Sequence, residues 1–332
     1  MSGGVLRPVF ALSDDPNRID LDGGRSLRLG EVIGKGSGAT VYRAALREAN
    51  GLERRVAVKL WASIASEESE QVLDVILRIA QRVACVEHAN VARVFACGTW
   101  RGRPYVVMEH VAGVSLAAFQ ESFARKQRRM PLDLSLFIAA EIAEALAAAR
   151  TARDRDGLQI GLLHHALSAR EVLLSFGGEV KVTDFEVSTT RGASSSIRSL
   201  RGVAARAATM APEVAQGSAG DARSDVFSFG VLLRELFVGP RMPPGISNAE
   251  AIRLAREGYV QPLTFMPHLP EGIVAVMERC LEIDPEYRYP NASALAFELR
   301  REVLAMGVGD GRYFLRDAVQ REWQQADEIT QF

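Results

Sequence analysis

The chain has 332 residues, which is long for a single hydrophobic core. Hydrophobic residues make up 48% and charged residues 24%, and the net charge of −1 gives no general attraction to nucleic acid or to an anionic membrane surface. The three cysteines have no Cys-x-x-Cys spacing, so neither a disulfide scaffold nor a thiolate metal site is supported. No stretch reaches the roughly 18 apolar residues of a membrane-spanning helix, and we expect no signal peptide because the apolar run at residues 9–12 is too short for one. We therefore expect a cytoplasmic protein with no membrane span.

In chain order, the sequence predicts four segments. Residues 1–27 are rich in Gly, Asp, Asn and Arg, which is typical of a flexible leader. Residues 28–112 predict alternating apolar strands with one helix at about 67–83, and residues 113–304 predict a mostly helical region. Residues 305–332 predict a helical tail.

Two surface features each have two interpretations. In the tail, Leu315, Val319 and Trp323 recur at four-residue spacing and form one apolar stripe on a helix. This stripe docks onto the larger lobe or binds a partner. A basic cluster lies near the start of the helical region, and it is a solvated surface or a patch for an acidic partner. Its members are Arg125, Lys126, Arg128 and Arg129.

A glycine-rich segment, residues 33–41, follows a predicted strand, and its small residues would let backbone amides approach phosphate oxygens. Further motifs follow it in order: VAVK at 56–59, HANV at 88–91, VVME at 106–109, VTDFE at 182–186, APE at 211–213, DVFSFG at 225–230 and DPEYR at 284–288. In this order they resemble the serine/threonine protein-kinase family over residues 30–300. The segment GEVKVTD is similar to bacterial members of that family.

The resemblance implies an α+β, bilobal protein-kinase-like fold, with a small β-rich N-terminal lobe containing one main helix and a larger helical C-terminal lobe. It also implies a site for ATP or ADP with Mg²⁺ or Mn²⁺, and no tightly bound cofactor. The expected cation ligands are Asp184 and, at a substituted position, Glu171. The expected nucleotide-binding residues are Gly34, Lys35, Gly36, Ser37, Gly38, Val41, Ala57, Lys59, Glu109 and Leu173.

The resemblance further implies contacts that hold the larger lobe together. Glu213 and Arg288 are expected to form a buried ion pair, and Asp225 is expected to accept backbone N–H groups of the catalytic loop. An apolar spine between the lobes is expected from Val83, Val94, His164 and Phe185.

Four positions depart from the family pattern. In the segment that resembles the catalytic loop, Ala166 replaces the Asp that accepts the substrate proton, and Glu171 replaces the Asn that holds a metal ion. Ile79 replaces the helix glutamate that pairs with the VAVK lysine, and Glu186 replaces the glycine of the Asp-Phe-Gly turn. A carboxylate at 171 can serve as an oxygen ligand for a hard cation, or it repels its acidic neighbour when no cation is present.

These losses lead us to expect a catalytically inactive regulatory or scaffolding protein rather than an enzyme. Loss of the general base alone costs about 10²–10⁴-fold in rate. The expected partner is a protein, such as an active kinase or another signalling protein, and nucleotide binding could order the lobes without hydrolysis. The alternative is a serine/threonine kinase with an atypical active site that transfers the γ-phosphate of ATP to protein. The serine-rich segment 188–206 is a target for phosphorylation by another kinase, or an unmodified loop.

Overall fold

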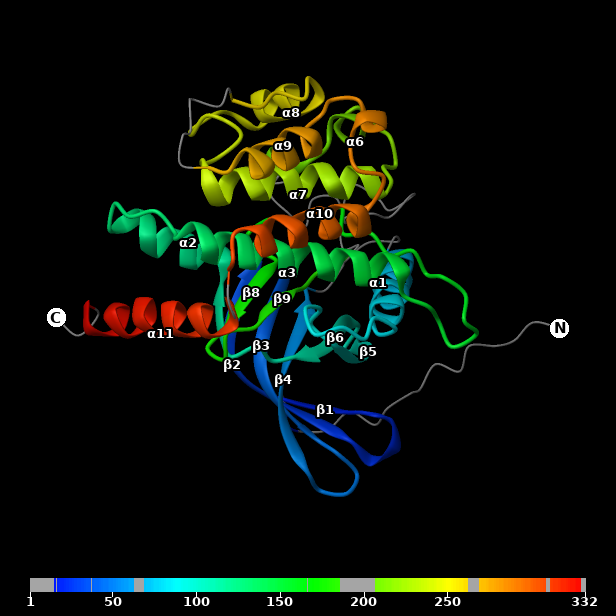
Figure 1. Ribbon diagram of the computed structural model, residues 1–332. Coiled ribbons are helices and arrows are strands. Elements are labelled where there is room, and N and C mark those ends of the chain that lie inside the picture. Colours follow the sequence, from blue (N-terminus) through cyan, green and yellow to red (C-terminus); the bar gives the residue numbers. More distant parts are fainter. Residues whose placement is uncertain are drawn as a thin grey trace.

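The structure, a computed structural model, describes residues 15, 17–36, 38–62, 69–165, 167–185, 207–261, 269–308 and 311–329. Three of the singled-out positions, Ser37, Ala166 and Glu186, lie outside the described residues, as does the segment 188–206. The described residues form a strand-rich N-terminal lobe and a larger helical C-terminal lobe (Figure 1).

The N-terminal lobe is built on an antiparallel sheet with strand order β1-β2-β3-β4-β6-β5. Alternation along the strands gives the sheet two apolar faces. On β4, Val56 and Val58 are fully buried in one face, whereas Lys59 projects from the other. The strands are β1 (Arg18–Asp20), β2 (Ser26–Gly36), β3 (Ala39–Arg47), β4 (Glu53–Trp61), β5 (Val94–Trp100) and β6 (Arg103–Glu109), with a short 3-10 turn at Asp22–Gly24.

The sheet begins inside the segment that we expected to be a flexible leader. Residues of β1 pair with the start of β2, with Ile19 opposite Leu27. Both side chains are buried, at 2% and 0% exposure, because they complete the apolar face under β2 and β3. This strand cannot be recognised from the sequence pattern, because β1 has only three residues and polar neighbours. The other segment boundaries stay predictions.

Helix α1 (Ser69–Val83) packs against β5 and β6. Its apolar residues Val72, Ile76 and Ala80 recur every four residues and are buried, so one stripe of the helix faces the sheet. The helix therefore forms the back wall of the space between the lobes.

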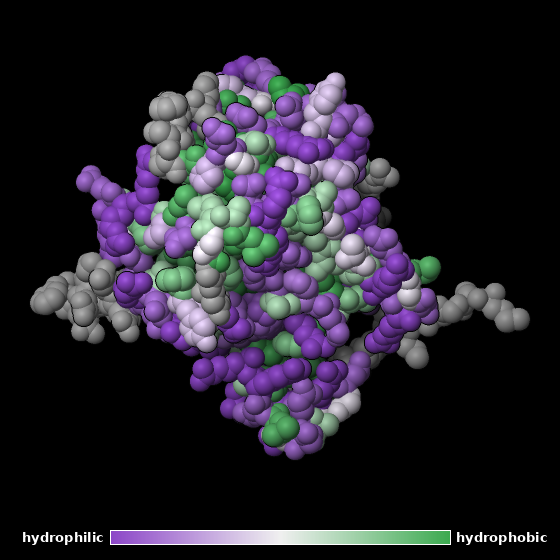
Figure 2. All heavy atoms as spheres, in the orientation of Figure 1, coloured by the Kyte–Doolittle hydropathy of each residue, from purple (hydrophilic) through white to green (hydrophobic). Residues whose placement is uncertain are grey.

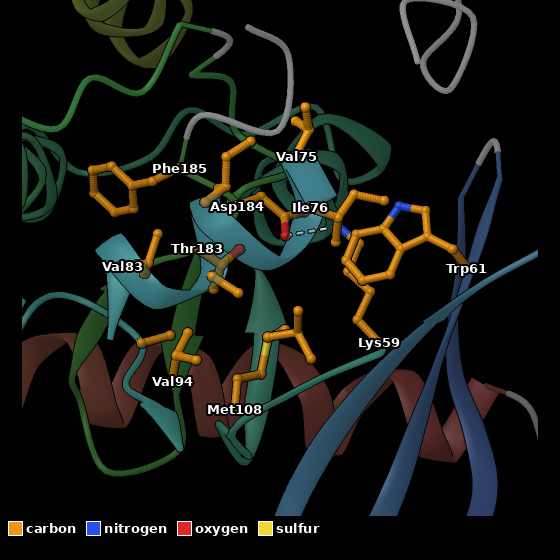
Figure 3. A pocket seen from close by; sticks show the side chains of 14 residues that line it. Lys59, Trp61, Val75, Ile76, Val83, Val94, Met108, Thr183, Asp184 and Phe185 are labelled. Atoms are coloured by element: carbon orange, nitrogen blue, oxygen red, sulfur yellow. Dashed lines mark hydrogen bonds and ion pairs between the residues drawn. The ribbon is translucent and has the colours of Figure 1, made fainter. Parts of the chain in front are cut away.

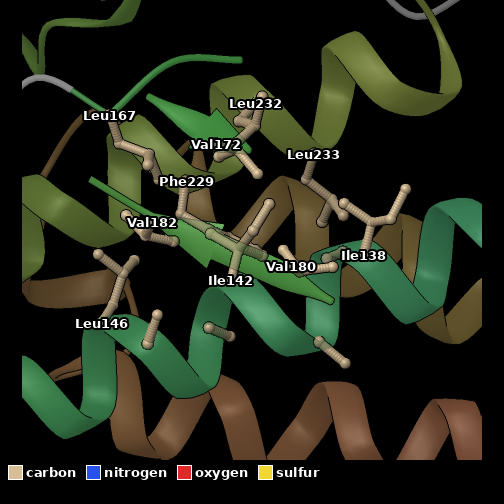
Figure 4. Packing of buried hydrophobic residues seen from close by; sticks show 14 of the residues in the cluster. Ile138, Ile142, Leu146, Leu167, Val172, Val180, Val182, Phe229, Leu232 and Leu233 are labelled. Atoms are coloured by element: carbon tan, nitrogen blue, oxygen red, sulfur yellow. The ribbon is translucent and has the colours of Figure 1, made fainter. Parts of the chain in front are cut away.

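The C-terminal lobe packs around α3 and α7, both of which are almost entirely apolar toward the core. Figure 4 shows side chains of α3, α7 and the β8–β9 hairpin meeting in one cluster. A three-stranded sheet, β7-β8-β9, covers the side toward the N-terminal lobe. The predicted α+β fold with two lobes is confirmed. The elements are β7 (Gly113–Ser115), α2 (Leu116–Arg125), α3 (Leu132–Thr151), β8 (Val172–Ser175), β9 (Val180–Val182), α6 (Pro212–Ala215), α7 (Ala222–Phe237), α8 (Asn248–Arg256), α9 (Glu271–Cys280), the 3-10 turn Pro285–Tyr287, α10 (Ala292–Ala305) and α11 (Gly311–Ile329).

An ion pair ties the start of α6 to the segment before α10. Arg288 donates two hydrogen bonds to Glu213, at 2.8 Å and 2.9 Å, and its side chain is fully buried. Ser224 of α7 donates a third hydrogen bond to Glu213, at 2.7 Å. Burial raises the pKa of Glu213, but these hydrogen bonds outweigh it and hold the pKa below its usual value.

Helix α11 docks along the C-terminal lobe, at the left of Figure 1, against α2, α3 and β8. Leu315 and Val319 are completely buried in this contact. Glu322 is 5% exposed and accepts from Lys126 at 2.6 Å and from Arg128 at 3.1 Å. The structure thus supports docking for the apolar stripe, and part of the basic cluster binds an acidic residue of the same chain.

The outer surface is mixed in character. Figure 2 shows hydrophilic side chains over most of the N-terminal lobe and a band of hydrophobic ones across the middle of the visible face. Phe297 and Leu304 on α10 are 69% and 77% exposed. No helix in the described part of the chain is long and apolar enough to cross a membrane.

The docked tail predicts a large effect of Leu315→Ala. The side chain is fully buried, so its truncation should lower the free energy of unfolding by about 2–5 kcal/mol. Phe314→Ala, at a neighbouring position that is 55% exposed, is the matched control and should change it much less. Chemical denaturation of both variants measures this, and equal losses would show that α11 is not docked.

The buried ion pair predicts an acid-dependent loss of stability. Glu213→Gln should lower the free energy of unfolding at pH 7 because it removes the charge that faces Arg288. The pKa of Glu213 is depressed in the folded state, so its contribution is complete above the usual value of 4.5 and is lost as the pH falls through the depressed pKa. The difference between wild type and variant should therefore shrink below about pH 4.5. A constant difference from pH 7 to pH 3 would contradict this.

Candidate functional site

An ion pair between the lobes lies at the centre of the site. The Nζ atom of Lys59, on β4, donates to Oδ1 of Asp184, two residues after β9, at 2.7 Å (Figure 3). The two side chains are 13% and 24% exposed. Asp184 has a φ of 63°, in the left-handed region, which costs a non-glycine residue free energy. The structure therefore brings together a cation and a carboxylate that are far apart in sequence.

Behind this ion pair is a cavity lined almost entirely by apolar side chains. Ile79 of α1 is one of them, so the helix presents an alkyl group where the family pattern has a carboxylate. The indole ring of Trp61 lies 5.3 Å from the Lys59 ammonium. Other lining residues include Val75, Ile76, Val83, Val94, Val106, Met108 and Phe185.

The β8–β9 hairpin carries Glu171 and Asp184 toward the same place. Thr183 donates its backbone N–H and its hydroxyl to the carbonyl of Glu171, at 2.8 Å and 3.2 Å. Glu171 is only 8% exposed and its carboxylate accepts from the Ser168 hydroxyl at 2.5 Å. Because Thr183 directly precedes Asp184, this pairing sets the two acidic residues at adjoining ends of the hairpin.

The glycine-rich segment forms the β2–β3 turn above Lys59. Gly34 pairs with Val41 on β3, and Val41 pairs with Lys59 on β4. Gly38 has a φ of 98°, a conformation that favours glycine at the turn. Ala57 projects from the same face of β4 as Lys59, since the two are two residues apart. Gly34, Val41 and Ala57 thus form a roof of small and apolar residues on the face of the sheet that carries Lys59.

The other predicted nucleotide-binding residues that the structure describes come from both lobes. Lys35 and Gly36 are in β2 and Leu173 is in β8, which puts them on opposite lobes. The carboxylate of Glu109, at the end of β6, binds Lys181 of β9 at 2.8 Å. The side chain of Glu109 is therefore engaged in an ion pair with the C-terminal lobe.

The loop before Ala166 is fixed from below by α7. Asp225 accepts from the backbone N–H groups of His164 and His165, each at 2.7 Å. His164 contacts the Thr183 carbonyl through Nε2 at 2.9 Å and packs its ring on Phe185, with centroids 4.9 Å apart. Burial and the nearby Arg82 lower the pKa of His165 to about 4, so its imidazole is neutral at physiological pH.

The sequence analysis missed two contributors to the site. Trp61 carried a usable signal, because it lies two residues after Lys59 and strand alternation puts both on one face. Ser168 carried no such signal, because its hydrogen bond to Glu171 depends on the loop conformation, which no spacing predicts.

Comparison with known proteins gives a consistent match. The family of protein tyrosine and serine/threonine kinases matches residues 27–299. The serine/threonine-protein kinase PksC of Streptomyces coelicolor is 32% identical over 85% of this chain and 49% of its own length. The tyrosine-protein kinase MasK of Myxococcus xanthus is 27% identical over 80% and 41%, and the serine/threonine-protein kinase PknB of Mycobacterium leprae is 30% identical over 82% and 42%. The chain thus spans half or less of the length of these relatives.

These relatives correct one of our expectations. We expected a protein that is not an enzyme, and that expectation is wrong, because the proteins that match most of this chain are named as kinases. We gave too much weight to the single side chains of Ala166, Ile79 and Glu171. Phosphoryl transfer depends chiefly on positioning and on electrostatic stabilisation, and the structure keeps Lys59 and Asp184 together. The chain belongs to the protein tyrosine and serine/threonine kinase family.

Proposed function

We propose that this chain is a serine/threonine-type protein kinase domain with an atypical active site. It binds ATP and a divalent cation between its lobes and transfers the γ-phosphate to a hydroxyl group of a protein. The observation that carries this proposal is the 2.7 Å ion pair between Lys59 and Asp184 beneath the glycine-rich turn. In this family such a lysine contacts the phosphates and such an aspartate holds the cation.

The donor set at this place fits a cation of the magnesium type. Asp184 and Glu171 offer carboxylate oxygens, the ligands that hard cations prefer. Among the described residues no group of three or more acidic, histidine or cysteine side chains could hold a metal. Mg²⁺ is commonly bound by one or two carboxylates together with substrate phosphates, so two are sufficient. The bound cation would supply positive charge to neutralise the phosphates.

Apolar residues of the two lobes offer surfaces for a purine ring. Val41 and Ala57 project from the roof, and Leu173 of β8 comes from the C-terminal lobe. Ile33, at the start of the glycine-rich segment, is 42% exposed although it is large and apolar. A purine ring between these residues would cover that apolar surface.

The rate should be low for this family. Ala166 cannot accept a proton, and His165 beside it is too weak a base when its pKa is about 4. A missing base costs about 10²–10⁴-fold relative to a typical turnover of about 1–100 s⁻¹. The transition state is loose, so positioning by Lys59 and the cation still gives most of the acceleration.

The first test removes the ion pair. Lys59→Ala and Asp184→Ala should each weaken binding of ATP with Mg²⁺ or Mn²⁺ by tenfold or more and abolish transfer of label from γ-labelled ATP to protein. Lys126→Ala is the control, since this lysine contacts Glu322 of the tail rather than the cleft. Titration calorimetry and labelling assays on the purified chain give the two measurements.

Two results would count against the proposal. One is wild-type protein that binds no ATP at millimolar concentration in the presence of either cation. The other is labelling that persists unchanged in Lys59→Ala, because it would come from another kinase in the preparation.

The second test supplies the missing base. Ala166→Asp should raise the rate of transfer by at least about tenfold and leave the Kd for ATP nearly unchanged, because a base acts only in the transition state. Ala124→Asp, on the exposed side of α2, adds the same charge away from the site and should have no effect. If the rate of Ala166→Asp equals that of wild type, proton acceptance does not limit this enzyme.

A further inference from the structure

The described α1 residues that line the cavity beside Lys59 include no carboxylate that could hold its ammonium in place. The α1 side chains that line the cavity are Val75, Ile76, Ile79, Ala80 and Val83, all of them apolar. Among the residues that the structure describes, the ammonium has two neighbours that stabilise its charge, the carboxylate of Asp184 at 2.7 Å and the indole of Trp61 at 5.3 Å.

The ring of Trp61 is held in a fixed position. Trp61 ends β4, pairs with Ala39 of β3 and is only 4% exposed. Its carbonyl accepts from Arg103 of β6 at 2.7 Å, which anchors the end of the strand. A cation within about 6 Å of an aromatic centroid is attracted to the ring, most strongly to tryptophan and most strongly when both are shielded from water. Lys59, with 13% of its side chain exposed, meets this condition.

The two partners of Lys59 differ in what they must do when a nucleotide binds. Asp184 is needed by the cation, so its carboxylate cannot remain dedicated to Lys59. Trp61 is neutral and binds neither the phosphates nor the divalent cation, so it can keep its contact with the ammonium when the nucleotide binds. In Figure 3 the indole lies beside Lys59, with Asp184 on the far side of the ammonium.

We propose that Trp61 is the positioning residue that keeps the Lys59 ammonium directed at the phosphates of ATP. The family pattern gives this role to a carboxylate on the helix that corresponds to α1. This inference rests on the proposed function, because it presupposes that ATP binds at Lys59. The proposed role of Trp61 predicts a difference between ligands with and without phosphates. Trp61 acts on the nucleotide only through an ammonium that meets phosphates, so it should matter for ATP and not for adenosine.

The first measurement is calorimetric and uses Trp61→Leu, Trp61→Phe and Val75→Ala. Trp61→Leu should raise the Kd for ATP with Mg²⁺ by about threefold to thirtyfold, the effect of losing a cation–π contact, and should leave the Kd for adenosine unchanged. Trp61→Phe keeps an aromatic face and should restore most of the affinity for ATP. Val75 lines the same cavity from α1, so Val75→Ala is the control and should leave the ratio of the Kd for ATP to the Kd for adenosine as in wild type.

The second measurement needs no nucleotide. The chain has four lysines, so the ε-methylene signals of lysine-labelled protein are few and Lys59 is assigned by its loss in Lys59→Arg. Its signal should be shifted upfield by the indole ring, and Trp61→Leu should remove the shift.

The outcomes separate the two proposals. If wild type binds ATP and Trp61→Leu raises the Kd values for ATP and adenosine equally, or neither of them, the inference is wrong and the proposed function stands. An unshifted Lys59 signal in wild type also overturns the inference. If wild type binds no ATP, the proposed function fails, and the inference falls with it.

Discussion

The buried carboxylate of Asp225 is the constraint on which the site depends. It is 5% exposed in the core of the C-terminal lobe, where a carboxylate is costly unless hydrogen bonds satisfy it. The bonds that satisfy it come from the backbone of His164 and His165, at 2.7 Å each. The hydrogen bonds that stabilise the Asp225 carboxylate therefore also fix the loop that leads to the site. Because they use backbone N–H groups, they do not depend on the side chains of that loop.

From this anchor a series of contacts leads to the other lobe. His164 contacts the carbonyl of Thr183, Thr183 donates to the carbonyl of Glu171, and the next residue, Asp184, receives Lys59. Each of these contacts uses backbone atoms or charged groups at the ends of the β8–β9 hairpin. An alanine methyl neither donates nor accepts a hydrogen bond, so contacts of this kind do not depend on the residue type at position 166. This explains how the arrangement around the ion pair is compatible with an alanine where the family has its base.

Motif order predicted the lobes, the helical core and the partners of Arg288 and Asp225, because these contacts are between residues that the family register specifies. It did not predict β1, which is too short to show alternation. Nor did it predict that Lys126 and Arg128 face Glu322, since a charge run has the same composition whether it faces water or a helix of its own chain. The conclusion on catalysis was wrong because it counted lost side chains, whereas the family's chemistry depends on where the remaining charges are held.

The family match ends at residue 299, but the tail helix α11 beyond it also contacts the β8–β9 hairpin. Gln320 of α11 donates to the carbonyl of Phe176 at 3.0 Å, and Arg312 binds Glu179 at 3.1 Å. Both contacts fall on the turn between β8 and β9, at the end of the hairpin opposite to Glu171 and Asp184. Gly178, with a φ of 82°, lies so close to the Arg312 carbonyl that a side chain there would collide with it. The core of the lobe thus contacts the hairpin at the end that carries Glu171 and Asp184, and α11 contacts it at the turn. Docking of the tail and order in the site are therefore parts of one packing arrangement.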